Sequence, residues 1–213
     1  MTRRIESLIA AYAELEMRIG DLVAARLGGI CAGCPKPCCR PDVCREVLES
    51  WWLRKVSQHV HGRWWPDDWR TAERCVALGP AGCILKAGRT ALCRSFVCDR
   101  YTKAYGDVWE AVFYSFAADL LMDLGTLSSR VNIEQLDERG VRARADKIDR
   151  RVRRASELLE RATALIDPAV GEAAKGLAAL KLLASVPRCL RATTQRAILE
   201  RVDAQVSPDR SPN

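Results

Sequence analysis

One short run of cysteines and prolines constrains the fold more than any other feature of the chain. The run, CAGCPKPCCRPDVC, extends from Cys31 to Cys44 and contains five of the ten cysteines of the 213-residue chain. Pro35, Pro37 and Pro41 disfavour a regular helix, so we expect a tight irregular loop. Something other than local secondary structure must hold these thiols together. Disulfides, a metal, redox chemistry and chance burial are the candidates.

The expected cellular compartment argues against disulfides. The N-terminal stretch MTRRIESLIAAYAELEM lacks the apolar run of a signal peptide, because Glu6, Glu14 and Glu16 interrupt it. No later stretch approaches the roughly 20 apolar residues of a membrane span. We therefore expect a cytoplasmic protein without a membrane partner. Disulfides seldom persist in a reducing cytosol, where clustered cysteines indicate metal binding or catalysis.

Helical spacing of apolar residues predicts a mostly α-helical fold. Apolar side chains recur at this spacing over residues 4–27, and Gly28 and Gly29 are expected to end that helix. Asp107 has the position of an N-cap for a helix that ends at Gly125. Further helices are expected at residues 44–60, 141–166, 170–183 and 188–206. Irregular cysteine-rich loops are expected to pack among the helices of the N-terminal part.

Composition divides the chain into parts. After residue 127 the cysteines stop apart from Cys189, and the aromatic residues disappear. We place a cysteine-cluster metal-binding domain at residues 1–127 and a helical C-terminal region at residues 128–206. A polar tail at residues 207–213 is expected to be disordered. The C-terminal helices could offer a surface for a protein partner.

A second group of cysteines strengthens the metal interpretation. It consists of Cys75, Cys83, Cys93 and Cys98, in a glycine-containing segment. Soft thiolates select zinc or iron–sulfur clusters over hard cations, and a C-x2-C pair on a turn can direct two sulfurs at one ion. The alternative is that the clustered cysteines are ordinary buried residues without a metal. Buried free cysteines usually lie on the apolar face of a helix or strand, whereas most of the clustered cysteines lie in expected loops.

The stretches CAGCPKPCC and GCILKAGRTALCRSFVC resemble the YkgJ-type cysteine-cluster family, whose domains are described as zinc- or iron-chelating. The likeness rests on a CxxCxxxCC motif and a later C-R-x-F-x-C motif, and it covers about residues 31–98. Cys44 and Cys189 match nothing in the family pattern. The resemblance implies a metal centre held by eight cysteines: Cys31, Cys34, Cys38, Cys39, Cys75, Cys83, Cys93 and Cys98.

Eight thiolates exceed the needs of one tetrahedral ion. They indicate two four-coordinate sites, or one iron–sulfur cluster with additional thiols. Iron–sulfur is slightly favoured over zinc, because neither group has the C-x2-C…C-x2-C form of paired zinc knuckles. The expected function is metal or cluster binding with an electron-transfer or redox-sensing role. The alternatives are an enzyme that uses the centre, such as a protein-modifying enzyme, and a zinc-structured nucleic-acid-binding module.

Other residues near the cysteines have simpler interpretations. His59 and His61 are the only histidines, and a partly exposed position at a helix end is favoured over metal ligation. Five tryptophans lie between the two cysteine groups, and we expect them to cover the metal site and exclude solvent. These are Trp51, Trp52, Trp64, Trp65 and Trp69.

The net charge of +7 and the run RGVRARADKIDRRVRR are features of nucleic-acid-binding proteins. Metal-bound thiolates would cancel part of this charge, however. Acidic residues along the same run favour a solvated helix face whose arginines are paired. Nucleic acid is therefore not an expected partner.

Overall fold

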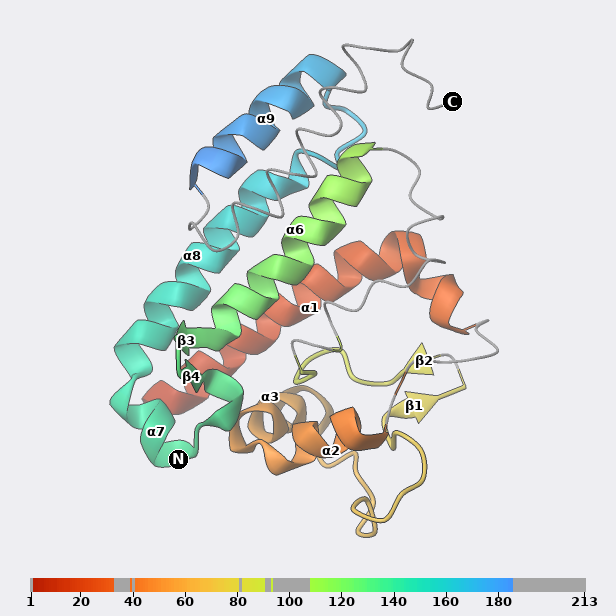
Figure 1. Cartoon of the computed structure of the whole chain (residues 1–213), viewed down its shortest axis with the longest axis vertical. Helices are drawn as coiled ribbons and strands as arrows, with labels where there is room; N and C mark the ends of the chain where they lie inside the picture. Colours follow the sequence, from red (N-terminus) through yellow and green to blue (C-terminus); the bar gives the residue numbers. More distant parts are fainter. Residues whose placement is uncertain are drawn as a thin grey trace.

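The computed structural model describes residues 2–32, 39, 41–80, 82–90, 93 and 108–185, with only the backbone at 26–29, 31, 32, 108 and 183–185. These residues form seven α-helices, a short 3-10 helix and four short strands (Figure 1). The mostly α-helical fold expected from the sequence is confirmed.

Three long helices form the centre of the fold. They are α1 (Arg3–Ala32), α6 (Val108–Gly125) and α8 (Ala145–Thr163), which pack side by side, and α9 (Glu172–Ser185) packs against α8 (Figure 1). Buried residues of α8 recur every three or four positions, as an amphipathic helix requires. Phe113, Phe116 and Trp52 are among the largest fully buried side chains. Burial of each contributes about 1.5–3 kcal/mol to folding.

The first helix is longer than its sequence predicts. Gly28 and Gly29 were expected to end it, but α1 continues through both to Ala32. A glycine inside a helix costs only about 1 kcal/mol relative to alanine. Ile30 follows the glycines and packs, partly buried, against the core, which offsets this cost. Cys31 therefore lies in the last turn of a helix and not in the expected loop.

The helix expected at residues 44–60 is divided in two. α2 (Pro41–Glu49) begins with a proline, which suits the first helical position because its missing N–H needs no partner there. α3 (Trp51–His61) begins after Ser50, whose hydroxyl accepts a hydrogen bond from the Leu53 N–H at 3.2 Å. The sequence prediction missed this serine cap, so it joined two helices into one.

The C-terminal helices follow the sequence prediction more closely. α6 ends at Gly125 as expected. The helix expected at residues 141–166 is divided into α7 (Glu138–Ala143), which is capped by Asp137, and α8. α9 corresponds to the helix expected at residues 170–183. Asp107, the helix expected at 188–206 and the tail at 207–213 lie outside the described residues.

Two short antiparallel hairpins were not expected from the sequence. β1 (Leu78–Gly79) pairs with β2 (Gly82–Cys83), with Leu78 opposite Cys83. β3 (Thr126–Ser128) pairs with β4 (Val131–Asn132), and the 3-10 helix η1 (Ile133–Gln135) follows. Strands of two or three residues are too short for a period-two pattern to be recognised.

The hydrophobic core includes residues from both sides of residue 127. α1 packs against α8, and the pairs Arg4–Asp146 and Arg18–Glu160 join the two helices at their surface. The Ser50 hydroxyl also donates to the Glu134 carbonyl oxygen at 2.6 Å, which ties the start of α3 to η1. The two parts of the chain therefore share one core.

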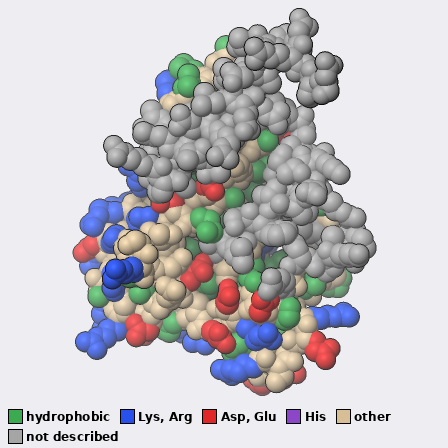
Figure 2. Space-filling model, in the orientation of Figure 1, with side chains coloured by type: hydrophobic (Ala, Val, Ile, Leu, Met, Phe, Trp, Pro, Cys, Tyr) green, Lys and Arg blue, Asp and Glu red, His purple; other side chains and the backbone are tan. Residues whose placement is uncertain are grey.

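Arginines of the basic run lie in ion pairs, as the sequence favoured. Arg151 contacts the Asp123 carboxylate at 3.2 Å, and Arg153 contacts Asp149 at 2.5 Å. Acidic and basic side chains are interspersed over the described surface on the face in Figure 2. No helix within the described ranges is both long and apolar enough to span a membrane.

Candidate metal centre

The structure describes four of the eight cysteines expected to bind metal, together with Cys44. Cys39, Cys75 and Cys83 are partly buried, Cys93 is exposed and Cys44 is buried, and none of the five is in a disulfide. Only the backbone of Cys31 is described. Cys34, Cys38, Cys98 and Cys189 lie outside the described residues.

A tight turn brings backbone donors to two of these thiols. The Leu78 N–H donates to the Cys75 carbonyl oxygen at 3.0 Å, and this closes a four-residue turn directly before β1. Inside the turn, the backbone N–H groups of Val76 and Ala77 lie close enough to the Cys44 sulfur to lower the pKa of Cys44, and the Ala77 N–H also acts to lower the pKa of Cys75. Such N–H donors stabilise a thiolate more than a neutral thiol.

The two thiols of this turn also interact directly. A hydrogen bond from the Cys75 thiol, assisted by the backbone donors and by Arg45, outweighs burial and lowers the pKa of Cys44 to about 6. The pKa of Cys75 is raised, because its ionisation would break the bond to Cys44, leave a charge buried and place two negative charges side by side. At neutral pH the pair therefore carries one proton and one negative charge.

Two further thiols lie close enough to interact electrostatically with this pair. The charge of Cys83, at the end of β2, raises the pKa of Cys75. The pKa of Cys93 is raised, mainly by desolvation and further by the nearby Cys83 and Cys44, and the Thr90 hydroxyl opposes this shift. Cys93 is nevertheless exposed to solvent. Cysteines from α2, from the turn, from β2 and from residue 93 thus converge on one region.

Cys44 is the member of this group that sequence reasoning missed. It was set aside because it matches no motif, and its side chain is only 5 % exposed on the apolar face of α2. The one available signal was its position five residues after Cys39. The order of residues in α2 turns Cys44 inward, toward the turn at Cys75, and only the packed structure reveals this contact.

The described thiols do not complete a ligand set by themselves. Among the described residues, no group of three or more His, Cys, Asp or Glu side chains is arranged so that it could hold a metal ion. Cys44 and Cys75 interact directly, whereas Cys83 acts on Cys75 through its charge, and Cys44 and Cys83 act on Cys93 in the same way.

Among the histidines and tryptophans, His61 and Trp52 have partners other than the thiols. The Nε2 atom of His61 accepts a hydrogen bond from the Lys86 N–H at 2.9 Å, whereas His59 is exposed. Trp52 is fully buried and packs edge-on against Tyr12 of α1, with the ring centres 5.3 Å apart. Trp52 therefore belongs to the hydrophobic core, and the expected role of the tryptophans as a cover of the metal site stays a prediction.

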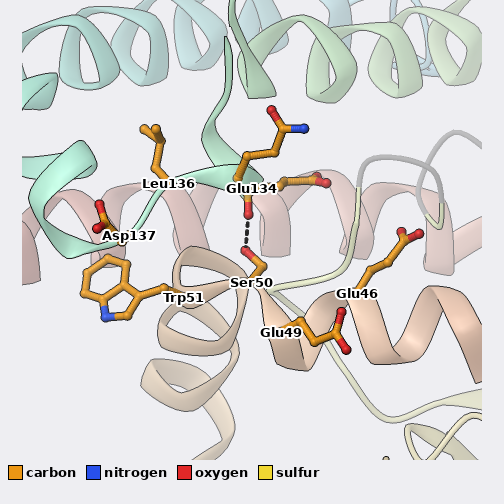
Figure 3. A pocket seen from close by; sticks show the side chains of 8 residues that line it. Glu46, Glu49, Ser50, Trp51, Glu134, Leu136 and Asp137 are labelled. Carbon is orange, nitrogen blue, oxygen red and sulfur yellow. Dashed lines mark hydrogen bonds between the residues drawn. The ribbon is translucent and has the colours of Figure 1, made fainter. Parts of the chain in front are cut away.

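A separate pocket of about 540 Å³ lies where α2 and α3 meet η1 (Figure 3). Trp51 and Leu136 form its apolar part, and the Trp51 ring lies near Asp137 in this view. Its acidic lining suits a cation better than an anion, and it contains no thiol. The residues that line it are Glu46, Glu49, Ser50, Trp51, Glu134, Gln135, Leu136 and Asp137.

Comparison of the chain with protein-family models, with curated proteins and with solved structures found no match. The arrangement of the thiols and the cysteine motifs therefore carry the functional argument.

Proposed function

We propose that the protein binds a metal ion or an iron–sulfur cluster through its clustered cysteines. The observation that carries this proposal is the convergence of Cys44, Cys75, Cys83 and Cys93, which come from separate parts of the chain. Four free thiols in one region are unusual for an ordinary core, because core cysteines serve as single small apolar residues.

The chemistry of the described donors fits a metal–thiolate centre. Metal ligation needs deprotonated cysteines, and Cys75 and the backbone donors already lower the pKa of Cys44 to about 6. N–H groups directed at sulfur also orient ligands and tune the metal. Arg45 lies close enough to act on the charge of Cys44, and a cation there offsets the negative charge of bound thiolates.

The complete ligand set requires cysteines beyond the described ones. Cys39 and the side chains of Cys31, Cys34, Cys38 and Cys98 remain the candidates for it. Adjacent side chains tend to point apart, so Cys38 and Cys39 are expected to bind different metal atoms. With Cys44 included, the chain offers nine thiols, which suffice for two tetrahedral sites or for one cluster with additional thiols.

Iron–sulfur and zinc remain the two forms of the proposal, with iron–sulfur slightly favoured. A cluster would fit electron transfer or redox sensing, whereas zinc would fit a structural role. Neither form is distinguished by the geometry of the thiols alone, because both accept all-cysteine ligation.

Purification without oxygen, followed by metal analysis and visible absorption, tests the proposal. A brown protein with iron and acid-labile sulfide establishes the cluster, and a colourless protein with stoichiometric zinc establishes the zinc form. A protein that contains neither metal, does not take up Zn²⁺ or iron with sulfide under reducing conditions, and has all ten thiols free would refute the proposal.

A further inference from the structure

Residues 86–88, which follow Cys83, are held by side chains that come from much earlier in the sequence. The Lys86 N–H donates to Nε2 of His61, in the last turn of α3, at 2.9 Å. Two residues later, the Gly88 N–H donates to Oε2 of Glu16 from α1. Alternate backbone amides of this stretch are therefore bound by two helices of the core.

Glu16 is placed where a carboxylate is costly unless it is bound. Its side chain is only 1 % exposed, on the face of α1 that packs into the core. Burial of a charged group without hydrogen bonds is strongly unfavourable, so the Gly88 N–H helps to stabilise it there. Glu14, two residues earlier, is exposed and offers a direct comparison on the same helix.

Gly88 brings the stretch into direct contact with the backbone of α3. Its φ is +77°, which favours glycine, and an added Cβ would lie 2.5 Å from the Ser57 nitrogen and 2.6 Å from the Leu53 carbonyl oxygen. No larger residue fits without displacement of the stretch. The position of this chain relative to α3 is thus fixed by backbone packing as well as by the two hydrogen bonds.

His61 can accept the Lys86 N–H only with an unprotonated Nε2. Burial, Lys86 and Arg89 lower the pKa of His61 below its usual 6.5, which keeps the ring neutral at physiological pH. The nitrogen that faces Lys86 is therefore engaged with the backbone. This role differs from metal ligation, although the residue lies beside the cysteine region.

We propose that His61 and Glu16 are positioning residues of the cysteine centre, which act on Cys83 and Cys93 by fixing the backbone of Lys86 and Gly88. The inference rests on the proposed function for its effect on metal binding. Its effect on the two thiols is independent of any metal. Residues that orient ligands without touching the metal commonly change metal affinity by about 10- to 100-fold.

The test compares His61→Ala with His59→Ala, and Glu16→Ala with Glu14→Ala, in the full chain. Affinity for Zn²⁺ is measured by competition with a chromophoric chelator. The alkylation rates of Cys83 and Cys93 in the metal-free protein are measured by mass spectrometry, and Tm is measured alongside. We expect His61→Ala and Glu16→Ala to weaken Zn²⁺ affinity about 10- to 100-fold and to change alkylation of the two cysteines. Neither exposed control should have this effect.

Conservative variants separate positioning from ligation. His61→Gln and Glu16→Gln each retain a side-chain acceptor and should restore most of the affinity. If His61→Gln lost as much affinity as His61→Ala, then His61 would be a ligand and the proposal would be wrong. Equal behaviour of His61→Ala and His59→Ala in both measurements would also refute it. If the wild type bound no metal, the proposed function would fail, and the alkylation rates would still decide the positioning role. If Glu16→Ala does not fold, the His61 variants decide.

Discussion

The helical core and the cysteine segment, which comprises the described residues between 75 and 93, are stabilised in different ways. The core buries large side chains such as Trp52, Phe113 and Phe116 between long helices. The regular structure of the cysteine segment is one hairpin of two-residue strands. Two of its backbone N–H groups donate hydrogen bonds to the side chains of Glu16 and His61. We therefore expect the core to form without a metal and the segment to depend on the core for its conformation, since its Ala77, Leu85 and Ala87 are buried in that core.

The largest expected effect is on metal content. Cys44→Ser and Cys75→Ser should each reduce bound metal from stoichiometric to nearly none, because each removes a thiolate from the pair around the turn. Metal analysis of the purified variants measures this. Cys189→Ser should retain its metal and serves as the control. Wild-type metal content in the Cys44→Ser variant would exclude Cys44 from the ligand set.

The next largest effect should be in the core. Trp52→Ala removes a fully buried ring that packs against Tyr12, and it should lower the free energy of unfolding by about 3–5 kcal/mol. Denaturant titration of the metal-free protein provides the value. Trp65→Ala removes a partly exposed ring and should cost much less. Equal losses for both variants would show that the core does not dominate stability.

A smaller loss should occur where the segment meets the core. Gly88→Ala should cost about 2–3 kcal/mol, because it combines an unfavourable φ with a close contact to α3. Gly62→Ala has a similar φ of +66°, and its ψ of −154° also favours glycine, but there is open space around its Cβ, so it should cost less, about 1–2 kcal/mol. The difference between the two variants measures the close contact. No difference would mean that the segment moves away from α3 freely.

Loss of the α3 cap should have a still smaller effect. Ser50→Ala removes the hydroxyl that accepts from Leu53 and donates to the Glu134 carbonyl oxygen. We expect a loss of about 1–2 kcal/mol in the free energy of unfolding. Ser129→Ala, at an exposed position, should be close to neutral. A neutral Ser50→Ala variant would argue against the link between α3 and η1.

The smallest expected change is in helicity after metal removal. A chelator should release the metal and alter thiol reactivity in the segment, while far-ultraviolet circular dichroism retains most of its helical signal. Trp52 emission should contribute little to any change, because this ring belongs to the core. A large loss of helical signal would show that the core also depends on the metal and would remove the contrast between the two regions.

The sequence by itself determined the helical character of the protein and its concentration of thiols. Apolar spacing located α6 and most of α8, because a helix that buries one face must repeat its apolar residues every three or four positions. Apolar spacing did not single out Glu16, because a glutamate is not counted as a core residue, and the structure alone shows that it is buried. The cysteine motifs indicated metal binding before any fold was known, and this stays a prediction.

Only the tertiary structure decided which distant residues meet. In the folded protein Cys44 lies at the turn that contains Cys75, and His61 accepts a hydrogen bond from the Lys86 N–H. The helix α1 continues through Gly28 and Gly29. None of these contacts has a local sequence signal, because each depends on the packing of elements that are far apart in the chain. The helix and strand propensities of a segment decide which secondary structure it can form. Its packing against the rest of the molecule decides which residues its side chains contact.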